Sequence, residues 1–187
     1  VFKFPFKKKY YEQDYYVSSN NFSTYKLIES WPSWPSRWVN IFGPHGCGKT
    51  HLSNILKKKI NNSIILDAKN ITNQTISNIE KVDCLIVDNY NSDIDEKLFY
   101  SILNQIKQLD RYLVINSDMP IKNMNFKLKD LKSRSESFVS LGIELPTDEL
   151  LRVIISKFFS DKQIEISPKI SEYIIKNIDR SYEKVFK

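Results

Sequence analysis

The sequence is poor in glycine and cysteine, and it lacks any long apolar run. Only 4 of its 187 residues are Gly and only 2 are Cys. Cys47 lies inside a Gly-containing loop and Cys84 begins an apolar stretch, which argues against the disulfide framework of a small secreted domain. No apolar run approaches the roughly 20 residues of a membrane-spanning helix, and no signal-peptide pattern opens the chain. We therefore expect a soluble, cytoplasmic protein without a membrane partner.

The charge balance is also modest. Lys and Arg number 28 against 22 Asp and Glu, which gives a formal net charge of +6. Because the lysines are spread along the chain, we interpret this excess as compositional bias rather than as a signal for nucleic-acid binding. Hydrophobic residues at 41% and aromatic residues at 13% are enough for the core of one substantial domain, with room for a small appended unit.

Three of the four glycines lie in one motif. Residues Gly43–Thr50, GPHGCGKT, match the pattern G-x-x-x-x-G-K-[ST] at every fixed position. The motif follows an apolar run, Trp38–Phe42, and leads into a helix-like segment, as a phosphate-binding loop requires. Glycines let successive backbone N–H groups face phosphate oxygens, Lys49 would reach the β and γ phosphates, and Thr50 would bind Mg²⁺. The motif predicts a site for ATP or ADP with Mg²⁺.

The remaining pattern alternates apolar runs with amphipathic segments. Continuous apolar runs suit strands that are covered on both faces, and their alternation with helices predicts an α/β fold with a parallel sheet. We expect helices at 22–30 and 95–110. The expected strands, after the first at 38–42, are 63–67, 83–88, 111–116 and 138–145.

After Pro146 the pattern indicates helices only. One helix is expected from Thr147 or Asp148 to about Phe159, a second from Pro168, and a last one from near Arg180. We therefore divide the chain into an N-terminal arm (1–14), an α/β nucleotide-binding domain (15–145) and a helical lid (146–187).

Polar residues follow the third and fourth expected strands. Asp88 ends the third strand and is a candidate Mg²⁺ ligand together with Thr50, because hard cations prefer oxygen. Asn89 follows it, and an amide can position water but cannot accept its proton. Asn116 and Asp118 end the fourth strand, where they could approach the γ phosphate or form only a turn.

Together these residues resemble the AAA+ ATPase domain of the DnaA family of replication initiators, and most closely Hda, its short regulatory homologue. The similarity rests on FGPHGCGKTHL at 42–52, on Val87-Asp88-Asn89, and on LKDLKSR at 128–134. It implies an AAA+ P-loop NTPase fold, with a five-stranded parallel sheet flanked by helices and a small C-terminal helical lid.

The resemblance also implies roles for single residues. It implies that Arg134 is an arginine finger acting on a neighbouring subunit's nucleotide, with Asp88, Asn89, Asn116 and Asp118 as the other catalytic residues. The residues that it implies for nucleotide binding are Tyr16 and Val17 against the adenine, Gly43, Pro44, His45, Gly46, Cys47, Gly48, Lys49, Thr50 and His51 around the phosphates, and Arg180 from the lid.

The function implied by the resemblance is regulation of replication initiation by promoting hydrolysis of DnaA-bound ATP. Since Asn89 stands where such ATPases usually carry an acidic residue, we expect the chain's own hydrolysis to be weak or partner-dependent. Two alternatives stay open: the ATPase domain of a DnaA initiator, and an adaptor that binds nucleotide only for stability.

The arm resembles the sliding-clamp-binding peptide of Hda, with Phe2, Phe4 and Phe6 in place of leucines and Val1 in place of its Gln. The rings could instead pack on the domain itself, and periodicity alone does not decide between these readings. Expected partners are therefore DnaA and the clamp, and self-association stays open. We expect no DNA-binding domain in this chain, since no segment matches the helix-turn-helix of DnaA.

Overall fold

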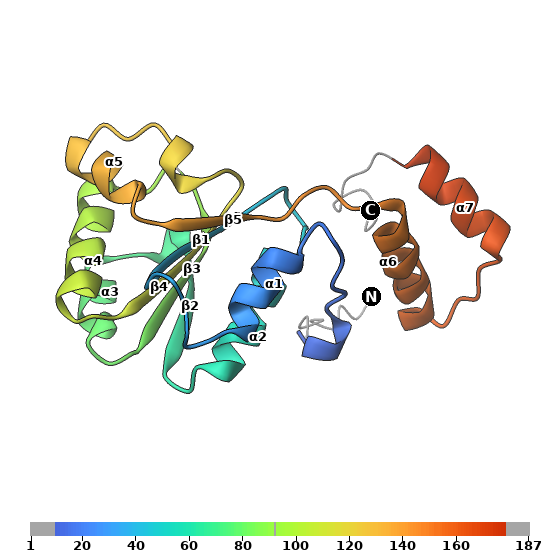
Figure 1. The fold of residues 1–187 in the computed structure, drawn as a ribbon, viewed down its shortest axis with the longest axis horizontal. Helices are drawn as coiled ribbons and strands as arrows, with labels where there is room; N and C mark the ends of the chain where they lie inside the picture. Colours follow the sequence, from blue (N-terminus) through green and yellow to red (C-terminus); the bar gives the residue numbers. More distant parts are fainter. Residues whose placement is uncertain (1–9, 92, 179–187) are drawn as a thin grey trace, which may run out of the picture.

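A computed structural model describes residues 10–91 and 93–178 (Figure 1). The expectations for Phe2, Phe4, Phe6, Arg180 and the last helix lie outside these described residues. Within them, strands and helices alternate from residue 22 to residue 142, and two helices follow. No described helix is long and apolar enough to cross a membrane.

Five parallel strands form one sheet in the order β2-β3-β4-β1-β5. In the interior strand β1, Val39 pairs with Val114 on one side and with Val139 on the other. All β1 residues between the ends are buried, as expected for a strand with helices over both faces. The predicted fold class is confirmed. The strands are β1 (Trp38–Phe42), β2 (Ser63–Asp67), β3 (Cys84–Tyr90), β4 (Tyr112–Ser117) and β5 (Val139–Gly142).

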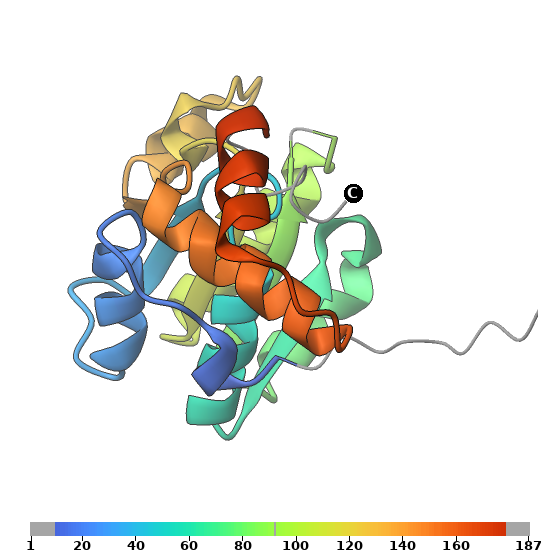
Figure 2. The same cartoon turned by 90° about the vertical axis from the view of Figure 1, so that its right-hand side faces the viewer.

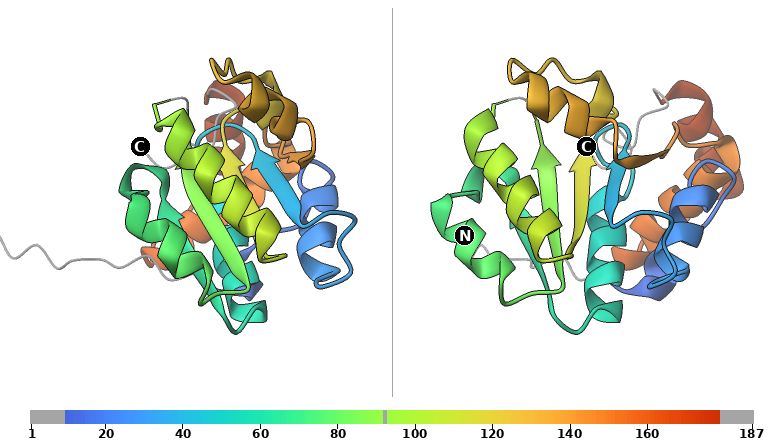
Figure 3. Two further views of the ribbon diagram at one scale, coloured as in Figure 1. Left: turned by 90° about the vertical axis from the view of Figure 1, so that its left-hand side faces the viewer. Right: turned by 60° about the vertical axis from the view of Figure 1, so that its left-hand side comes forward.

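Helices cover both faces of the sheet (Figure 3). Helices α1 and α2 contribute to the core on one face, and α3, α4 and α5 to the core on the other. The described α-helices are α1 (Phe22–Glu29), α2 (Lys49–Lys59), α3 (Asn73–Ile79), α4 (Glu96–Gln108), α5 (Lys129–Ser135), α6 (Asp148–Asp161) and α7 (Pro168–Asn177), and the 3-10 turns are Glu12–Asp14, Ala68–Asn70 and Ile121–Asn123.

Two short helices, α3 and α5, were not predicted from the sequence. Each has 7 residues, and α3 is rich in Asn, Gln, Ser and Thr, which are modest helix formers. The start of α3 is stabilised by a capping box between Thr72 and Thr75. Helix α5 buries one large apolar side chain, Leu131, against the core. Tertiary packing, rather than intrinsic propensity, stabilises both helices.

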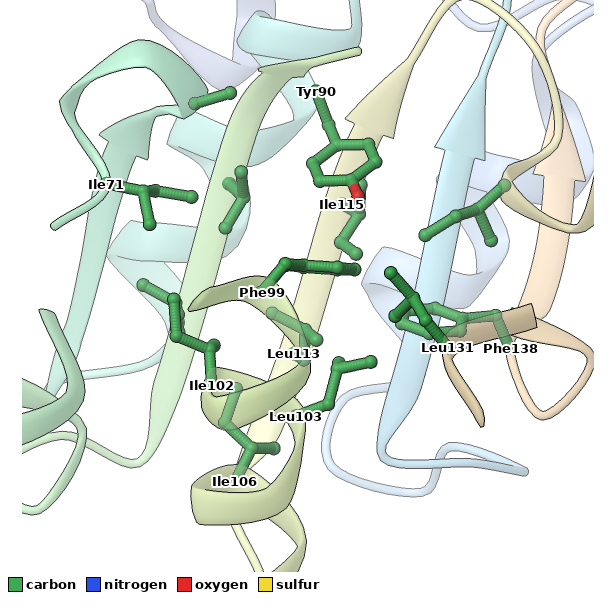
Figure 4. Close-up of a cluster of buried hydrophobic side chains, with 14 of the residues drawn as sticks. Ile71, Tyr90, Phe99, Ile102, Leu103, Ile106, Leu113, Ile115, Leu131 and Phe138 are labelled. Carbon is green, nitrogen blue, oxygen red and sulfur yellow. The ribbon is translucent and has the colours of Figure 1, made fainter. Parts of the chain in front are cut away.

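Helix α4 anchors the core on its face of the sheet (Figure 4). Its N-cap, Asp95, accepts hydrogen bonds from two backbone N–H groups in the first turn. The fully buried side chains of α4 point toward Leu113 and Ile115 of β4; they are Phe99, Ile102, Leu103 and Ile106. Burial of each such side chain stabilises the fold by about 1.5–3 kcal/mol. Helix α4 therefore holds in place the strands whose ends carry the polar residues.

Helix α2 has the same role on the other face. Leu52, Ile55 and Leu56 are fully or almost fully buried against the sheet, in a cluster that includes Ile41 of β1 and Ile86 of β3. Because α2 begins at Lys49, directly after the phosphate loop, this packing fixes the loop at the carboxyl edge of the sheet.

The last two described helices pack on each other at the end of the molecule opposite α4 and α5 (Figures 1 and 2). Leu151 and Ile155 of α6 and Ile175 of α7 are the buried centre of that contact. Lys157 of α6 forms an ion pair of 2.6 Å with Asp14. Strand β5 ends at Gly142 and α6 begins at Asp148, and the domain boundary at 146 stays a prediction.

Candidate nucleotide-binding site

The loop between β1 and α2 adopts backbone angles that favour glycine. Gly46 has a φ of 81° and Gly48 a φ of 101°. A Cβ on Gly43 would lie 2.5 Å from the carbonyl oxygen of Ile143, and one on Gly48 would lie 3.0 Å from the ring of Tyr15. The loop is therefore a close-fitting concave turn that precedes a helix N-terminus, which is the geometry of a phosphate-binding nest.

Lys49 is directed back over this loop, and only 7% of the residue is exposed. Its Nζ donates to the carbonyl oxygens of Gly43 at 2.6 Å and Pro44 at 3.1 Å, and it lies 3.3 Å from Oδ1 of Asp118. A buried ammonium group requires such partners. Phosphate oxygens can replace them, so the lysine is already held where a nucleotide would bind.

Thr50, Asp88 and Asn116 form one hydrogen-bonded group. The hydroxyl of Thr50 donates to Oδ2 of Asp88 at 2.7 Å, and the Asn116 amide donates to Oδ1 of Asp88 at 2.9 Å and to the Ser53 hydroxyl at 2.7 Å. The hydroxyl and the carboxylate supply the oxygen donors that Mg²⁺ prefers, with phosphates and water for the remaining positions. Their proximity fits the predicted metal site.

Asn116 also presents an unused acceptor. Its Oδ1 is buried and has no hydrogen-bond partner among the described residues. Such an unpaired acceptor costs about 1–3 kcal/mol unless a donor reaches it. Ser53, which fixes the Asn116 amide, was missed by the sequence analysis because it lies one helical turn beyond the loop motif.

Asn89 is directed to a different partner. Its backbone has a left-handed φ of 56°, at a register shift between β3 and β4, and asparagine tolerates this conformation. Its exposed side chain donates from Nδ2 to Oδ2 of Asp67 at 2.9 Å, and this hydrogen bond lowers the pKa of Asp67. The Asp67 contact was not predicted, because it joins the ends of two strands 22 residues apart.

Tyr15, which was not predicted as a site residue, lies against the phosphate loop. The Tyr15 ring contacts Gly48, stacks on Tyr25 with centroids 5.8 Å apart, and meets the His51 ring edge-on at 5.3 Å. Tyr16 is exposed and Val17 half-buried. The only sequence signal for Tyr15 is that it adjoins Tyr16.

The other predicted loop residues differ in exposure. His51 Nε2 lies 2.7 Å from the Tyr11 carbonyl oxygen, and burial lowers the pKa of His51. His45 is exposed and Pro44 is half-buried. Cys47 is buried behind the loop, where burial raises the pKa of its thiol. Among the described residues, no three His, Cys, Asp or Glu side chains form a cluster that could hold a metal ion.

Arg134 is not brought to this group. It lies on α5 with its guanidinium carbon 4.7 Å from the centroid of the Tyr100 ring, and it lines a cavity with Ser36 and Arg37, which precede β1. The phosphate loop follows β1, so the two features lie at opposite edges of a parallel sheet. Arg180 lies outside the described residues.

Known proteins resemble the chain over most of its length. A family model described as RNA helicase matches residues 39–131. The chromosomal replication initiator protein DnaA of Symbiobacterium thermophilum is 24% identical over 202 residues, covering 95% of this chain and 44% of that protein. The chain thus spans less than half the length of this curated relative.

Solved structures show the same fold. AMPPCP-bound DnaA from Aquifex aeolicus superposes with a TM-score of 0.76 at 20% identity, covering 96% of this chain and 63% of that one. Domain III of Thermotoga maritima DnaA gives 0.77 at 19% identity, with coverages of 97% and 86%. The order of the five strands and these similarities together show that the chain has the fold of the AAA+ domain of DnaA.

Proposed function

We propose that this protein binds ATP or ADP with Mg²⁺ and regulates replication initiation by promoting hydrolysis of ATP held by a DnaA subunit, as the resemblance to Hda implies. The observation that carries the proposal is the separation of two groups of residues. Lys49, Thr50 and Asp88 gather at the carboxyl edge of the sheet, whereas Arg134 lies at the amino-terminal edge.

Nucleotide binding is supported by the state of the loop. The donors of Lys49 are already directed at loop carbonyl oxygens, and Asp88 is held by the Thr50 hydroxyl and the Asn116 amide. Little reorganisation is then needed when phosphates arrive, which favours affinity. The similar DnaA of Aquifex aeolicus was solved with AMPPCP, which supports an adenine nucleotide as the ligand.

A role of Arg134 on another subunit is supported by distance. The five residues of β1 separate the cavity that Arg134 lines from the phosphate loop, and at about 3.3 Å per residue this is roughly 16 Å. An arginine side chain cannot span that distance to its own nucleotide. It can meet the nucleotide of an adjacent subunit, where an arginine finger in trans is worth about 10³–10⁵ in rate.

Weak turnover by the chain itself is supported by Asn89. An amide cannot accept the proton of an attacking water. In addition, Nδ2 of Asn89 already donates a hydrogen bond to Oδ2 of Asp67. The nucleotide would then act mainly as a structural ligand that holds the lid and the sheet together.

The decisive experiment replaces the arginine and measures hydrolysis by DnaA. We expect Arg134→Ala to leave MgADP affinity unchanged and to abolish stimulation of DnaA-bound ATP hydrolysis in a single-turnover assay. Arg134→Lys should also fail, because lysine keeps the charge but loses the planar fork of donors. The matched control is Arg152→Ala, at a surface arginine that pairs with Glu172 of α7. Full stimulation by the Arg134 variants would refute the proposed role.

A second candidate is the ATPase domain of a DnaA initiator, because the curated relative that matches 95% of this chain is DnaA itself. Such a domain would assemble with copies of itself when ATP is bound. Sedimentation of the chain with ATP and with ADP therefore separates the two functions: ATP-dependent self-assembly favours the initiator domain, and stimulation of added DnaA favours the regulator.

The adaptor reading, in which nucleotide only stabilises the chain, depends on the N-terminal arm. A pull-down with sliding clamp can compare the full chain with one that lacks residues 1–9. Clamp recovery that depends on the arm, without any stimulation of DnaA, would favour the adaptor. Equal recovery from both chains would remove the arm as the docking segment.

A further inference from the structure

A cavity of about 320 Å³ opens at the amino-terminal edge of the sheet. Its walls come from three places in the sequence: the segment before β1, the end of α4 with the turn into β4, and the end of α5. The charged residues that line it are Arg37, Lys107, Asp110, Arg111 and Arg134. Neither the nucleotide site nor the proposed function uses the cavity as a whole.

Cations are in excess around this cavity. Four of its five charged side chains are basic, and Asp110 is already paired with Arg37 at 2.7 Å. Arg111 pairs through Nη1 with Asp83 at 2.8 Å. Lys107 and Arg134 form no ion pair with any residue in the described part of the chain. The cavity therefore carries positive charge that the surrounding described residues do not neutralise.

Two arginine donors at this cavity are buried without an acceptor. Within the described ranges, Nε of Arg111 and Nη1 of Arg134 are shielded from solvent and have no hydrogen-bond partner. Buried polar atoms in native proteins are almost always paired, with protein, water or a bound ion. Both orphaned donors belong to residues that line this one cavity, so the unpaired donors and the excess of positive charge occur in the same place.

We propose that this cavity binds a phosphate group, either free or esterified in a small molecule. Arginine presents a planar fork of donors that matches phosphate oxygens, and Ser36 and Ser137 add hydroxyl groups to the same walls. Trp38 and Ile106 supply an apolar side. The volume corresponds to about ten water molecules at roughly 30 Å³ each, so a phosphate and an attached organic group both fit.

This site is separate from the phosphate loop. Trp38, at the cavity, begins β1, and the loop begins only after Phe42 ends it. A ligand of the cavity therefore does not occupy the nucleotide site. The inference concerns one chain by itself and does not rest on the proposed action on DnaA, so either can fail without the other.

The test is a calorimetric titration with inorganic phosphate, and in a second arm with phenyl phosphate, at low ionic strength. Both arms use the wild-type chain and Lys49→Ala, which disables phosphate binding at the loop. We expect Lys49→Ala to retain one saturable phosphate site, whose affinity added NaCl weakens. Tighter binding of phenyl phosphate would identify an esterified ligand, and equal binding would identify free phosphate; both results support the site.

Two variants assign that binding to the cavity. Arg134→Gln removes one orphaned donor and its charge, whereas Arg111→Lys removes Nε but keeps a cation beside Asp83. Each should weaken phosphate binding in the Lys49→Ala background at least tenfold, and Arg152→Gln should leave it unchanged. Far-UV circular dichroism checks folding; if Arg134→Gln does not fold, Arg111→Lys decides. Equal affinity in the folded variants, loss of binding in Lys49→Ala alone, or no binding of either probe would overturn the proposal.

Discussion

At the carboxyl edge of the sheet these charged side chains already have polar partners: Lys49 lies against Asp118, and Asp88 accepts hydrogen bonds from Thr50 and Asn116. At the amino-terminal edge cations outnumber carboxylates, and two arginine donors are buried without an acceptor among the described residues. The same sheet therefore carries one edge that is largely complete without a ligand and one edge that is not. The first is prepared for a ligand that replaces existing contacts, and the second for an anion that supplies missing ones.

The difference also concerns how each edge is assembled. The carboxyl-edge site is built mainly from one continuous loop with its helix, and from the ends of two adjacent strands. The amino-edge cavity is built from three segments that lie far apart in the sequence. A continuous motif can be recognised by its spacing, whereas a site assembled from scattered residues cannot.

The largest expected effect is a loss of ADP affinity from a substitution at the carboxyl edge that leaves the amino-terminal edge unaffected. Lys49→Ala should weaken MgADP binding at least about 100-fold, because two charge-assisted hydrogen bonds to phosphate are lost at about 1.5–3 kcal/mol each. Binding of inorganic phosphate at the amino-terminal edge should stay unchanged. Fluorescence titration with a labelled ADP measures the first quantity, with Lys57→Ala, an exposed lysine on the same helix, as the control. An unchanged ADP affinity would mean that the loop does not bind the nucleotide phosphates.

An intermediate effect is expected on the rate of ATP hydrolysis when a carboxylate is introduced at position 89, at the carboxyl edge. Asn89→Asp introduces a carboxylate that can accept a proton, but it lies against Asp67, to which Asn89 now donates at 2.9 Å. Repulsion between the two carboxylates should limit the gain. We expect the double variant Asp67→Asn with Asn89→Asp, which restores one hydrogen bond, to hydrolyse ATP about ten times faster than wild type.

The single variant Asn89→Asp should lie between wild type and the double variant in steady-state phosphate release. The matched control is Asp67→Asn alone, which removes the carboxylate without adding a base at position 89. If neither the single nor the double variant is faster than wild type, the side chain at position 89 does not reach the attacking water, and the slow turnover proposed above has another cause.

The smallest expected effect is a pH dependence of the free energy of unfolding, caused by His51 near the carboxyl edge. Burial lowers the pKa of His51 below its ordinary value of 6.5, so near that pH the unfolded chain binds more protons than the folded one. The free energy of unfolding should therefore fall as the pH decreases from 7 through 6.5 toward the lowered pKa.

Urea unfolding at pH 7.0 and 5.5 measures this dependence. His51→Gln should show a smaller difference between the two pH values than wild type. His45→Gln, at an exposed histidine in the loop that precedes α2, is the matched control. An identical pH dependence in all three proteins would show that His51 does not titrate as its surroundings imply.

Much of the fold could be predicted from short-range patterns. The continuous apolar runs predicted the strands, with shifts of one or a few residues at their ends, because a strand buried on both faces needs apolar side chains throughout. Helix α4 was predicted from its amphipathic spacing. Helices α3 and α5 were not, since their short polar sequences have no comparable periodicity and depend on contacts with the core.

The candidate site was predictable to the same extent. The loop residues and Asp88 follow from the motif and the strand end, and the structure places Lys49, Thr50, Asp88, Asn116 and Asp118 within one connected group. Their roles in catalysis and binding stay predictions. Tyr15 and Ser53 were missed because their importance depends on which way a side chain points after folding.

The sequence by itself predicted the ligand class and determined the fold class, because glycines at fixed spacing and uninterrupted apolar runs act through neighbours a few residues away. Only the tertiary structure decided that Asn89 bonds to Asp67, that Arg134 lies far from the chain's own loop, and that four cations meet around one cavity. Those facts depend on the order in which the strands pair. Strand order is set by packing between residues that are distant in the chain, and spacing within a motif carries no information about it.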